Sequence, residues 1–99
     1  MSDMPGDRQR SVRVRIAGRV QGVGYRYWTE RVAGELGLAG WVRNRRDGSV
    51  EALFAGPAAE VAEMLERCRD GPRSARVTAV SVIEEGQSVP EGFEVLPTL

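Results

Sequence analysis

Apolar and polar residues alternate over residues 10–17, where Val12, Val14 and Ile16 are separated by arginines. A period of two predicts a strand with one face buried in the core. From about Arg26 to Leu36 the pattern changes, and apolar residues recur at the three- and four-residue spacing of one helix face. The predicted apolar stripe consists of Tyr25, Trp28, Val32 and Leu36.

The middle of the chain reads as two short strands joined by a tight turn. Residues 41–44 form the first strand, and residues 49–55 return with alternating apolar positions. The Asp47-Gly48 pair between them is a typical hairpin signal. We therefore predict an antiparallel hairpin here.

A second helix is expected after Gly56, with Pro57 in its first turn, where proline is tolerated. Gly71-Pro72 ends it. Residues 76–84 are rich in β-branched side chains and predict a strand whose buried face is ambiguous, and 93–95 can add a short last strand. The order β-α-β-β-α-β predicts an α+β, ferredoxin-like split βαβ fold, with two helices on one face of an antiparallel sheet.

The chain has 99 residues, which fits a single domain. Residues 1–9 are polar and aperiodic and are predicted to be a flexible tail, so the domain spans residues 10–99. No apolar run approaches the roughly 20 residues of a membrane helix, and no signal-peptide pattern is present. We therefore expect a cytoplasmic protein with no membrane association.

The chain contains no histidine and no lysine, and Cys68 is its only cysteine. This composition excludes a histidine general base, the Ser-His-Asp and Cys-His arrangements, and most zinc sites. We expect no metal and no cofactor. Chemistry must then depend on arginine, carboxylate, amide, hydroxyl or backbone N–H groups.

Charge is unevenly distributed along a chain whose net charge is zero. Residues 1–48 carry ten arginines and five acidic residues, and residues 49–99 carry four arginines and nine acidic residues. A basic half within a neutral chain suits a small anionic ligand. It argues against nucleic acid, because nucleic-acid-binding domains are usually basic overall.

The candidate site is the glycine-rich stretch 18–26, which connects the first strand to the first helix. Glycines permit unusual backbone angles, and the free N–H groups of such a loop and of a helix N-terminus attract anions. Arg26 follows in the first helical turn, and its planar guanidinium can bind two phosphate oxygens. The alternative is a tight connection with a solvated arginine. Neither the Walker A pattern nor the dinucleotide pattern G-x-G-x-x-G is present.

Two stretches together resemble the signatures of acylphosphatases. Residues 18–26 (GRVQGVGYR) match the first, and residues 40–44 (GWVRN), continuing to DGSVE at 47–51, match the second. The likeness extends to GFEV at 92–95 and covers nearly everything after the tail. Tyr25 stands where the family often has phenylalanine.

The resemblance implies a ferredoxin-like fold and hydrolysis of carboxyl–phosphate anhydrides to a carboxylate and inorganic phosphate. It assigns the two functional residues to Arg26 and Asn44. It also places phosphate on the backbone of the 19–24 loop, formed by Arg19, Val20, Gln21, Gly22, Val23 and Gly24. The expected partner is a small acyl phosphate, handled by a monomer.

Three other interpretations are open at this point. The domain could bind an anion or nucleotide without turnover. It could be an RNA-binding module, since these share the element order, although the candidate strand 49–55 carries only Phe54 as an aromatic residue. It could also be a carbamoyl-phosphate-handling domain cut from a larger maturation protein.

Overall fold

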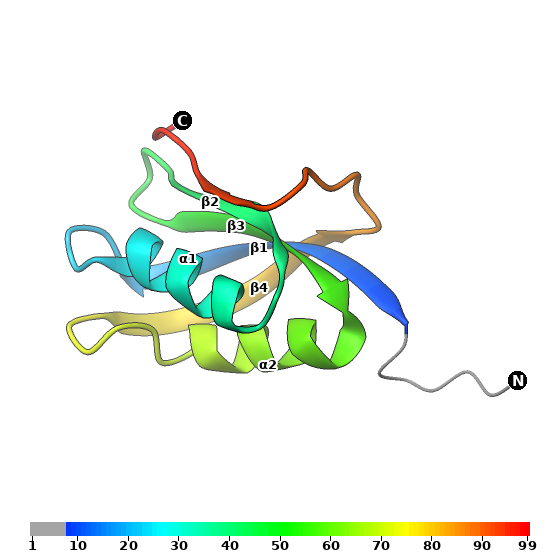
Figure 1. Ribbon diagram of the computed structural model, residues 1–99. Helices are drawn as coiled ribbons and strands as arrows, with labels where there is room; N and C mark the ends of the chain where they lie inside the picture. The colour runs from blue at the N-terminus through cyan, green and yellow to red at the C-terminus, as the bar shows by residue number, and fades with distance from the viewer. Residues whose placement is uncertain (1–7) are drawn as a thin grey trace, which may run out of the picture.

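The computed structural model describes residues 8–99, which form five strands and two helices (Figure 1). Residues 1–7, which make up most of the predicted flexible tail, lie outside this range. In chain order the elements are β1 (Gln9–Arg19), α1 (Tyr25–Glu35), β2 (Ala39–Asn44), β3 (Val50–Pro57), α2 (Ala58–Cys68), β4 (Arg76–Glu85) and β5 (Phe93–Val95).

The strands form one sheet in the order β4-β1-β3-β2-β5. β1 pairs antiparallel with both β3 and β4, and β2 pairs antiparallel with β3. The predicted ferredoxin-like fold is thus confirmed. The short last strand differs from the antiparallel expectation, because β5 adds to the outer edge of β2 in parallel, with Gly40 opposite Phe93.

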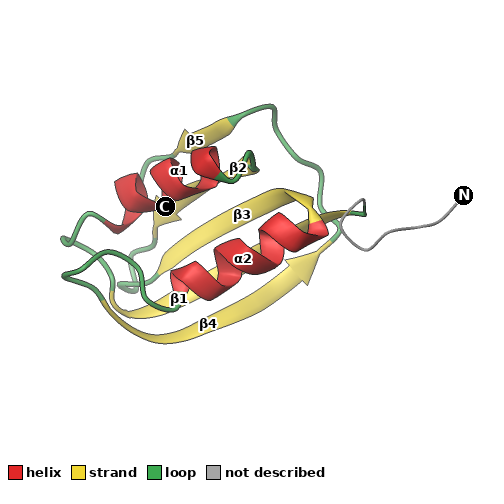
Figure 2. Cartoon of the chain, turned by 60° about the horizontal axis from the view of Figure 1, so that its bottom comes forward, coloured by secondary structure: helices red, strands yellow, loops and turns green. Residues whose placement is uncertain are grey.

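Both helices lie on one face of the sheet, as predicted (Figure 2). The side chains of Val12, Val14 and Ile16 point toward them and are fully buried. The predicted stripe of α1 is partly correct: Tyr25 and Val32 are buried, whereas Trp28 and Leu36 are half-buried and pack against the core. On α2 the buried side chains are Val61, Met64 and Cys68.

The second helix begins one residue later than predicted. Pro57 ends β3 and occupies the N-cap position of α2 in an extended conformation, with φ −58° and ψ 139°. The ambiguous strand, β4, turns Val80 toward the core opposite Ile16. Val82 points the same way but is 46% exposed, since it lies near the sheet edge.

β3 is buried on both faces, although its sequence alternates. Leu53 points away from the helices and is still only 2% exposed. It lies between Arg13 of β1 and Trp41 of β2, its partners across the two neighbouring strands. Because β3 is central, the long stems of these neighbours exclude water from a face that no helix covers.

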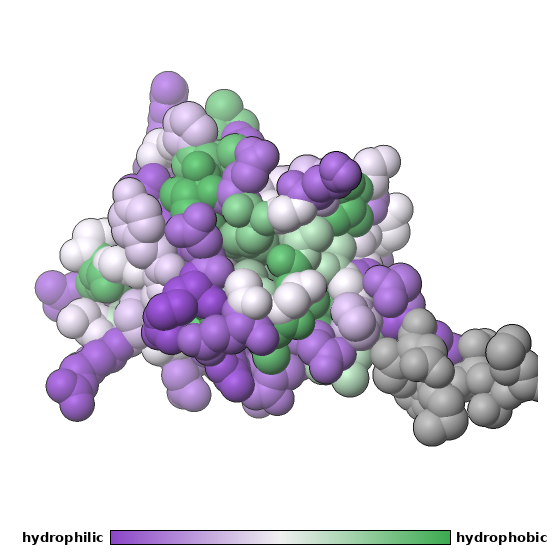
Figure 3. Space-filling model, in the orientation of Figure 1, coloured by the Kyte–Doolittle hydropathy of each residue, from purple (hydrophilic) through white to green (hydrophobic). Residues whose placement is uncertain are grey.

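The outer surface of the helices is hydrophilic. Figure 3 shows hydrophilic side chains gathered over the lower part of the face on which α1 and α2 lie. Arg67 of α2 bonds Glu63 at 2.9 Å and reaches Glu35 of α1 at 3.7 Å. In the part of the chain that the structure describes, no helix has the length and apolarity needed to span a bilayer.

Candidate active site

The loop between β1 and α1 turns on two glycines with left-handed backbones. Gly22 has φ 73°, and Gly24 has φ 82° and is the N-cap residue of α1. These angles suit glycine because other residues place Cβ against the backbone there. The N-cap residue makes no side-chain capping bond, and the first turn contains no acidic residue. The N–H groups at this helix end are therefore available to an anion.

Arg26 is the second residue of α1 and is half-buried. Its guanidinium carbon lies over the ring of Tyr27, 6.0 Å from the ring centroid. Among residues 8–99 its side chain has no hydrogen-bond or ion-pair partner. A cation at a helix N-terminus is unfavourable against the helix dipole. An anion bound beside Arg26 would remove this conflict.

Asn44 is the last residue of β2 and approaches the loop from the neighbouring hairpin. Its backbone pairs with Val50, and its carbonyl oxygen accepts a bond from the Leu99 N–H at 3.2 Å. Its side-chain amide makes no hydrogen bond with any described residue. The backbone is thus fixed while the carboxamide is free to bind a ligand or water.

One small pocket of about 110 Å³ brings these groups together. The glycine loop and the β2–β3 turn meet at the same end of the molecule (Figure 1). The lining residues are Val20, Gly22, Gly24, Tyr25, Arg26, Tyr27 and Asn44. Arg26 and Asn44, the two functional residues predicted from the sequence, are among them, together with half of the predicted 19–24 loop.

The other three residues of the predicted loop lie outside this lining. Arg19 is the exposed last residue of β1 and pairs with Arg76. Val23 is half-buried and packs against the core. Gln21 turns its side chain toward the β2–β3 hairpin.

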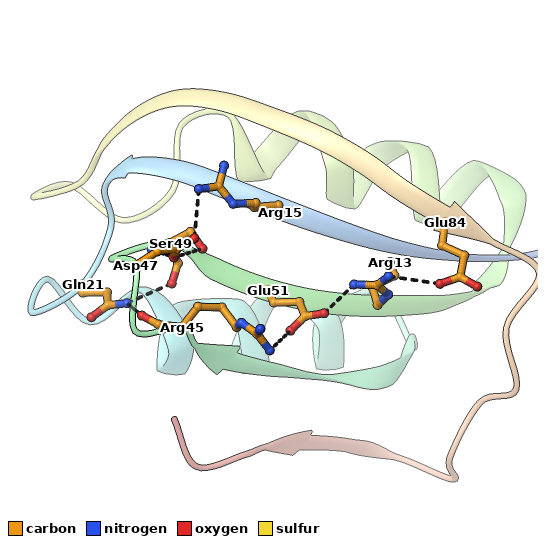
Figure 4. Close-up of polar contacts among 8 residues, drawn as sticks. All are labelled: Arg13, Arg15, Gln21, Arg45, Asp47, Ser49, Glu51 and Glu84. Carbon is orange, nitrogen blue, oxygen red and sulfur yellow. Dashed lines mark hydrogen bonds and ion pairs between the residues drawn. The ribbon is translucent and has the colours of Figure 1, made fainter. Parts of the chain in front are cut away.

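Gln21 fastens the loop to the hairpin that carries Asn44. Its amide nitrogen donates to the carbonyl oxygens of Arg45 at 2.7 Å and Ser49 at 2.8 Å (Figure 4). Both N–H groups of the amide are used. These two bonds hold the glycine-rich loop against the hairpin that carries Asn44. The sequence predicted Gln21 as a loop residue and gave no sign of this side-chain role.

The turn of the hairpin is itself held by Asp47. Its carboxylate accepts bonds from the Ser49 hydroxyl at 2.6 Å and the Ser49 backbone N–H at 2.9 Å, and from Arg15 at 3.1 Å. The Ser49 hydroxyl, then the Ser49 N–H and Arg15, lower the pKa of Asp47 well below its usual range. The ionised carboxylate is therefore the form that stabilises the turn.

We expect Asp47→Ala to lower the melting temperature more at pH 7 than at pH 3. The pKa of Asp47 is lower in the folded than in the unfolded chain, where it is about 3.9. Its stabilisation is thus present above that pH and is lost as the pH falls through the folded-state pKa. Circular dichroism melts between pH 7 and pH 3 measure the difference. Asp70→Ala is the control, because Asp70 is an exposed aspartate whose side chain has no partner among the described residues. A pH-independent difference for Asp47→Ala would contradict the prediction.

A buried carboxylate supports the base of the same hairpin on the uncovered face of the sheet. Glu51 is 9% exposed and accepts bonds from Arg13 at 2.6 Å and Arg45 at 3.1 Å. Bonds to Glu51, and then to Glu84, raise the pKa of Arg13. Figure 4 shows these contacts running from Glu84 to the turn. Two cations on one carboxylate offset the cost of burying it.

The side chains of Tyr25, which lines the pocket, and of Cys68 are both buried. The Tyr25 hydroxyl donates to the carbonyl oxygen of Cys68 at 2.7 Å. Burial, together with Cys68, raises the pKa of Tyr25 far above its usual range, and burial raises the pKa of the Cys68 thiol to about 12. Cys68 is thus the core residue that its helical position predicts and cannot supply a thiolate near neutral pH.

The fold and this pocket together define a class: a ferredoxin-like domain with a candidate phosphoryl-binding loop after its first strand. The family model for acylphosphatase matches residues 12–95. The chain belongs to the acylphosphatase family, and it is an enzyme of that class. Enzymes of this family act on small acyl phosphates.

Individual relatives agree with this assignment. The chain is 75% identical over 65 residues to an acylphosphatase of Nitrobacter hamburgensis, covering 66% of each chain. It is 54% identical over 91 residues to one of Mesorhizobium japonicum, covering 91% of this chain and 97% of the relative. The crystal structure of the acylphosphatase from Bacillus subtilis superposes with a TM-score of 0.80 at 37% identity, covering 90% of this chain and 99% of that one.

Proposed function

We propose that the protein hydrolyses the carboxyl–phosphate anhydride of small acyl phosphates, using Arg26 and the 19–24 loop to hold phosphate and Asn44 to orient water. The observation that carries this proposal is the shared pocket: Arg26 and Asn44 line it, and neither side chain has a hydrogen-bond partner among residues 8–99. Polar groups without protein partners beside a helix N-terminus are suited to binding a charged ligand.

In the proposed reaction, the protein mainly positions the substrate and the water and stabilises the charge of the transition state. The water oxygen attacks phosphorus, and the bond from phosphorus to the bridging oxygen breaks. The carboxylate leaves with the bonding electron pair. Because carboxylic acids have a pKa of about 4, the leaving group needs no proton. The transition state is loose, so positioned donors supply most of the rate enhancement.

Each group has one task in this scheme. The guanidinium of Arg26 and the loop N–H groups bind the phosphoryl oxygens and their developing charge. The carboxamide oxygen of Asn44 accepts a hydrogen bond from the attacking water. This bond directs a lone pair of the water oxygen toward phosphorus. No side chain of the pocket is a general base, and the water proton passes to a phosphoryl oxygen of the substrate. We place this activity in a cytoplasmic monomer that needs no metal.

A substrate panel tests the proposal. We expect the purified protein to release phosphate from acetyl, benzoyl and carbamoyl phosphate, with the same rate in EDTA, and to leave phosphate monoesters intact. Monoesters have poorer leaving groups and would need a general acid that the pocket lacks. Heat-denatured protein corrects for spontaneous hydrolysis. Equal activity on monoesters, or none on any anhydride, would refute the proposed reaction.

A further inference from the structure

Tyr27 is an exposed aromatic side chain at the rim of the pocket. It lies in the first turn of α1, directly after Arg26, and is 66% exposed. Its hydroxyl has no hydrogen-bond partner among the described residues. A tyrosine in this position adds little to the core, so its placement is not explained by folding. The other exposed large apolar side chains within residues 8–99 lie outside this pocket: Val82, Ile83, Val89 and Leu99.

The pocket is small. Its volume of about 110 Å³ is well below the roughly 300–1,000 Å³ of sites that enclose a drug-sized ligand. Its polar groups, from Arg26, Asn44 and the loop backbone, suit the phosphoryl group. With the phosphoryl group held there, a bulky acyl group extends past the rim.

The rim offers the acyl group an aromatic surface and no carboxylate, since the lining contains no acidic residue. The guanidinium of Arg26 lies over the Tyr27 ring, and most of the remaining ring surface faces solvent. Aromatic rings pair favourably in offset or edge-to-face contacts at centroid distances of about 4.5–7 Å. A flat aromatic acyl group gains this contact, and an acetyl group does not.

We propose that Tyr27 contacts the acyl group and makes the protein select aromatic acyl phosphates over acetyl phosphate. This proposal rests on the proposed function and names its preferred substrate class. A second role for Tyr27, holding the Arg26 guanidinium in place, would affect every acyl phosphate equally. Substrate selectivity therefore separates the two roles.

The test compares kcat and KM for benzoyl and acetyl phosphate in the parent protein, Tyr27→Phe and Tyr27→Ala. We expect Tyr27→Ala to lower the benzoyl-to-acetyl ratio of kcat/KM by about 5- to 10-fold, which matches the worth of one aromatic contact. The loss should come through KM, because the contact exists in both the ground state and the transition state. Tyr27→Phe keeps the ring and should keep the ratio.

An equal loss on both substrates, or an unchanged ratio in Tyr27→Ala, would overturn the proposal. Calorimetric binding of benzoylphosphonate and acetylphosphonate gives the same ratio without turnover. A parent protein that hydrolyses no anhydride would refute the proposed function, and the phosphonate ratio would still decide the role of Tyr27. A ratio that falls in Tyr27→Ala supports the aromatic contact, and one that does not fall overturns it.

Discussion

Replacing Arg26 with alanine is expected to lower kcat for acyl phosphate hydrolysis by about 10²- to 10³-fold, the usual cost of losing one well-placed transition-state donor. The guanidinium lines the pocket and has no hydrogen-bond or ion-pair partner among residues 8–99, so its removal leaves no buried group unpaired. The fold should therefore persist. If the guanidinium also binds the product, as proposed, the inhibition constant of inorganic phosphate should rise by about tenfold or more.

Arg26→Lys separates charge from shape. An ammonium keeps the positive charge but cannot donate two parallel bonds, so this variant should stay well below the parent in kcat. Arg31→Ala is the matched control on the same helix, since Arg31 is exposed and, among residues 8–99, bonds only Glu35 at 3.0 Å. Steady-state kinetics and circular dichroism give the measurement. Near-normal turnover in a folded Arg26→Ala protein would remove Arg26 from the mechanism.

Much of the fold follows from patterns that act over a few residues. The alternation in residues 10–17 predicts β1, and the Asp47-Gly48 turn predicts the β2–β3 hairpin that the structure contains. Each of these features depends on local backbone preference and on the periodicity of one buried face. Sequence reasoning is sufficient where neighbouring residues decide the conformation.

Features that depend on distant segments were missed or ambiguous. The parallel pairing of β5 depends on which edge of β2 is free, and the burial of Leu53 depends on side chains from two other strands. Gly40 shows the same limit. It has φ 139°, and a Cβ at this position would overlap the Leu53 carbonyl oxygen. Its necessity is visible only once β2 and β3 are paired.

Some features of the candidate site were likewise predicted from the sequence, and others were not. Arg26 was a candidate from its position after the glycine-rich loop, Asn44 was identified by resemblance, and the structure brings both to one pocket. The hydrogen bonds from the Gln21 side chain to the β2–β3 hairpin could not be predicted. They end on backbone carbonyl groups, which every residue has and which carry no sequence signal. No prediction was made for Tyr27, which lies outside the predicted apolar stripe of the helix.

Asn44 is expected to differ from Arg26 in its effect on phosphate binding. We expect Asn44→Ala to lower kcat by about 10²- to 10³-fold while the inhibition constant of inorganic phosphate changes little. The proposed partner of the carboxamide is the attacking water rather than the phosphoryl group. An interaction made only in the transition state lowers kcat without weakening ground-state binding.

The backbone around Asn44 should survive this change. Its strand pairing with Val50 and the bond from Leu99 use main-chain atoms, and Gln21 holds the hairpin through other carbonyl groups. Arg46→Ala, at an exposed position in the adjacent turn, controls for disturbance of the hairpin and should retain kcat. Asn44→Asp keeps the shape but places a negative charge beside the phosphoryl group, so it should also raise KM by repulsion.

The decisive comparison is between kcat and phosphate inhibition, measured with benzoyl phosphate on the same preparations. If Asn44 orients water, Asn44→Ala loses turnover and keeps phosphate affinity, whereas Arg26→Ala loses both. A rise in the phosphate inhibition constant of Asn44→Ala equal to that of Arg26→Ala would instead make the carboxamide a phosphate ligand. Turnover within a few-fold of the parent would exclude Asn44 from the reaction, because no other side-chain amide lines the pocket within residues 8–99.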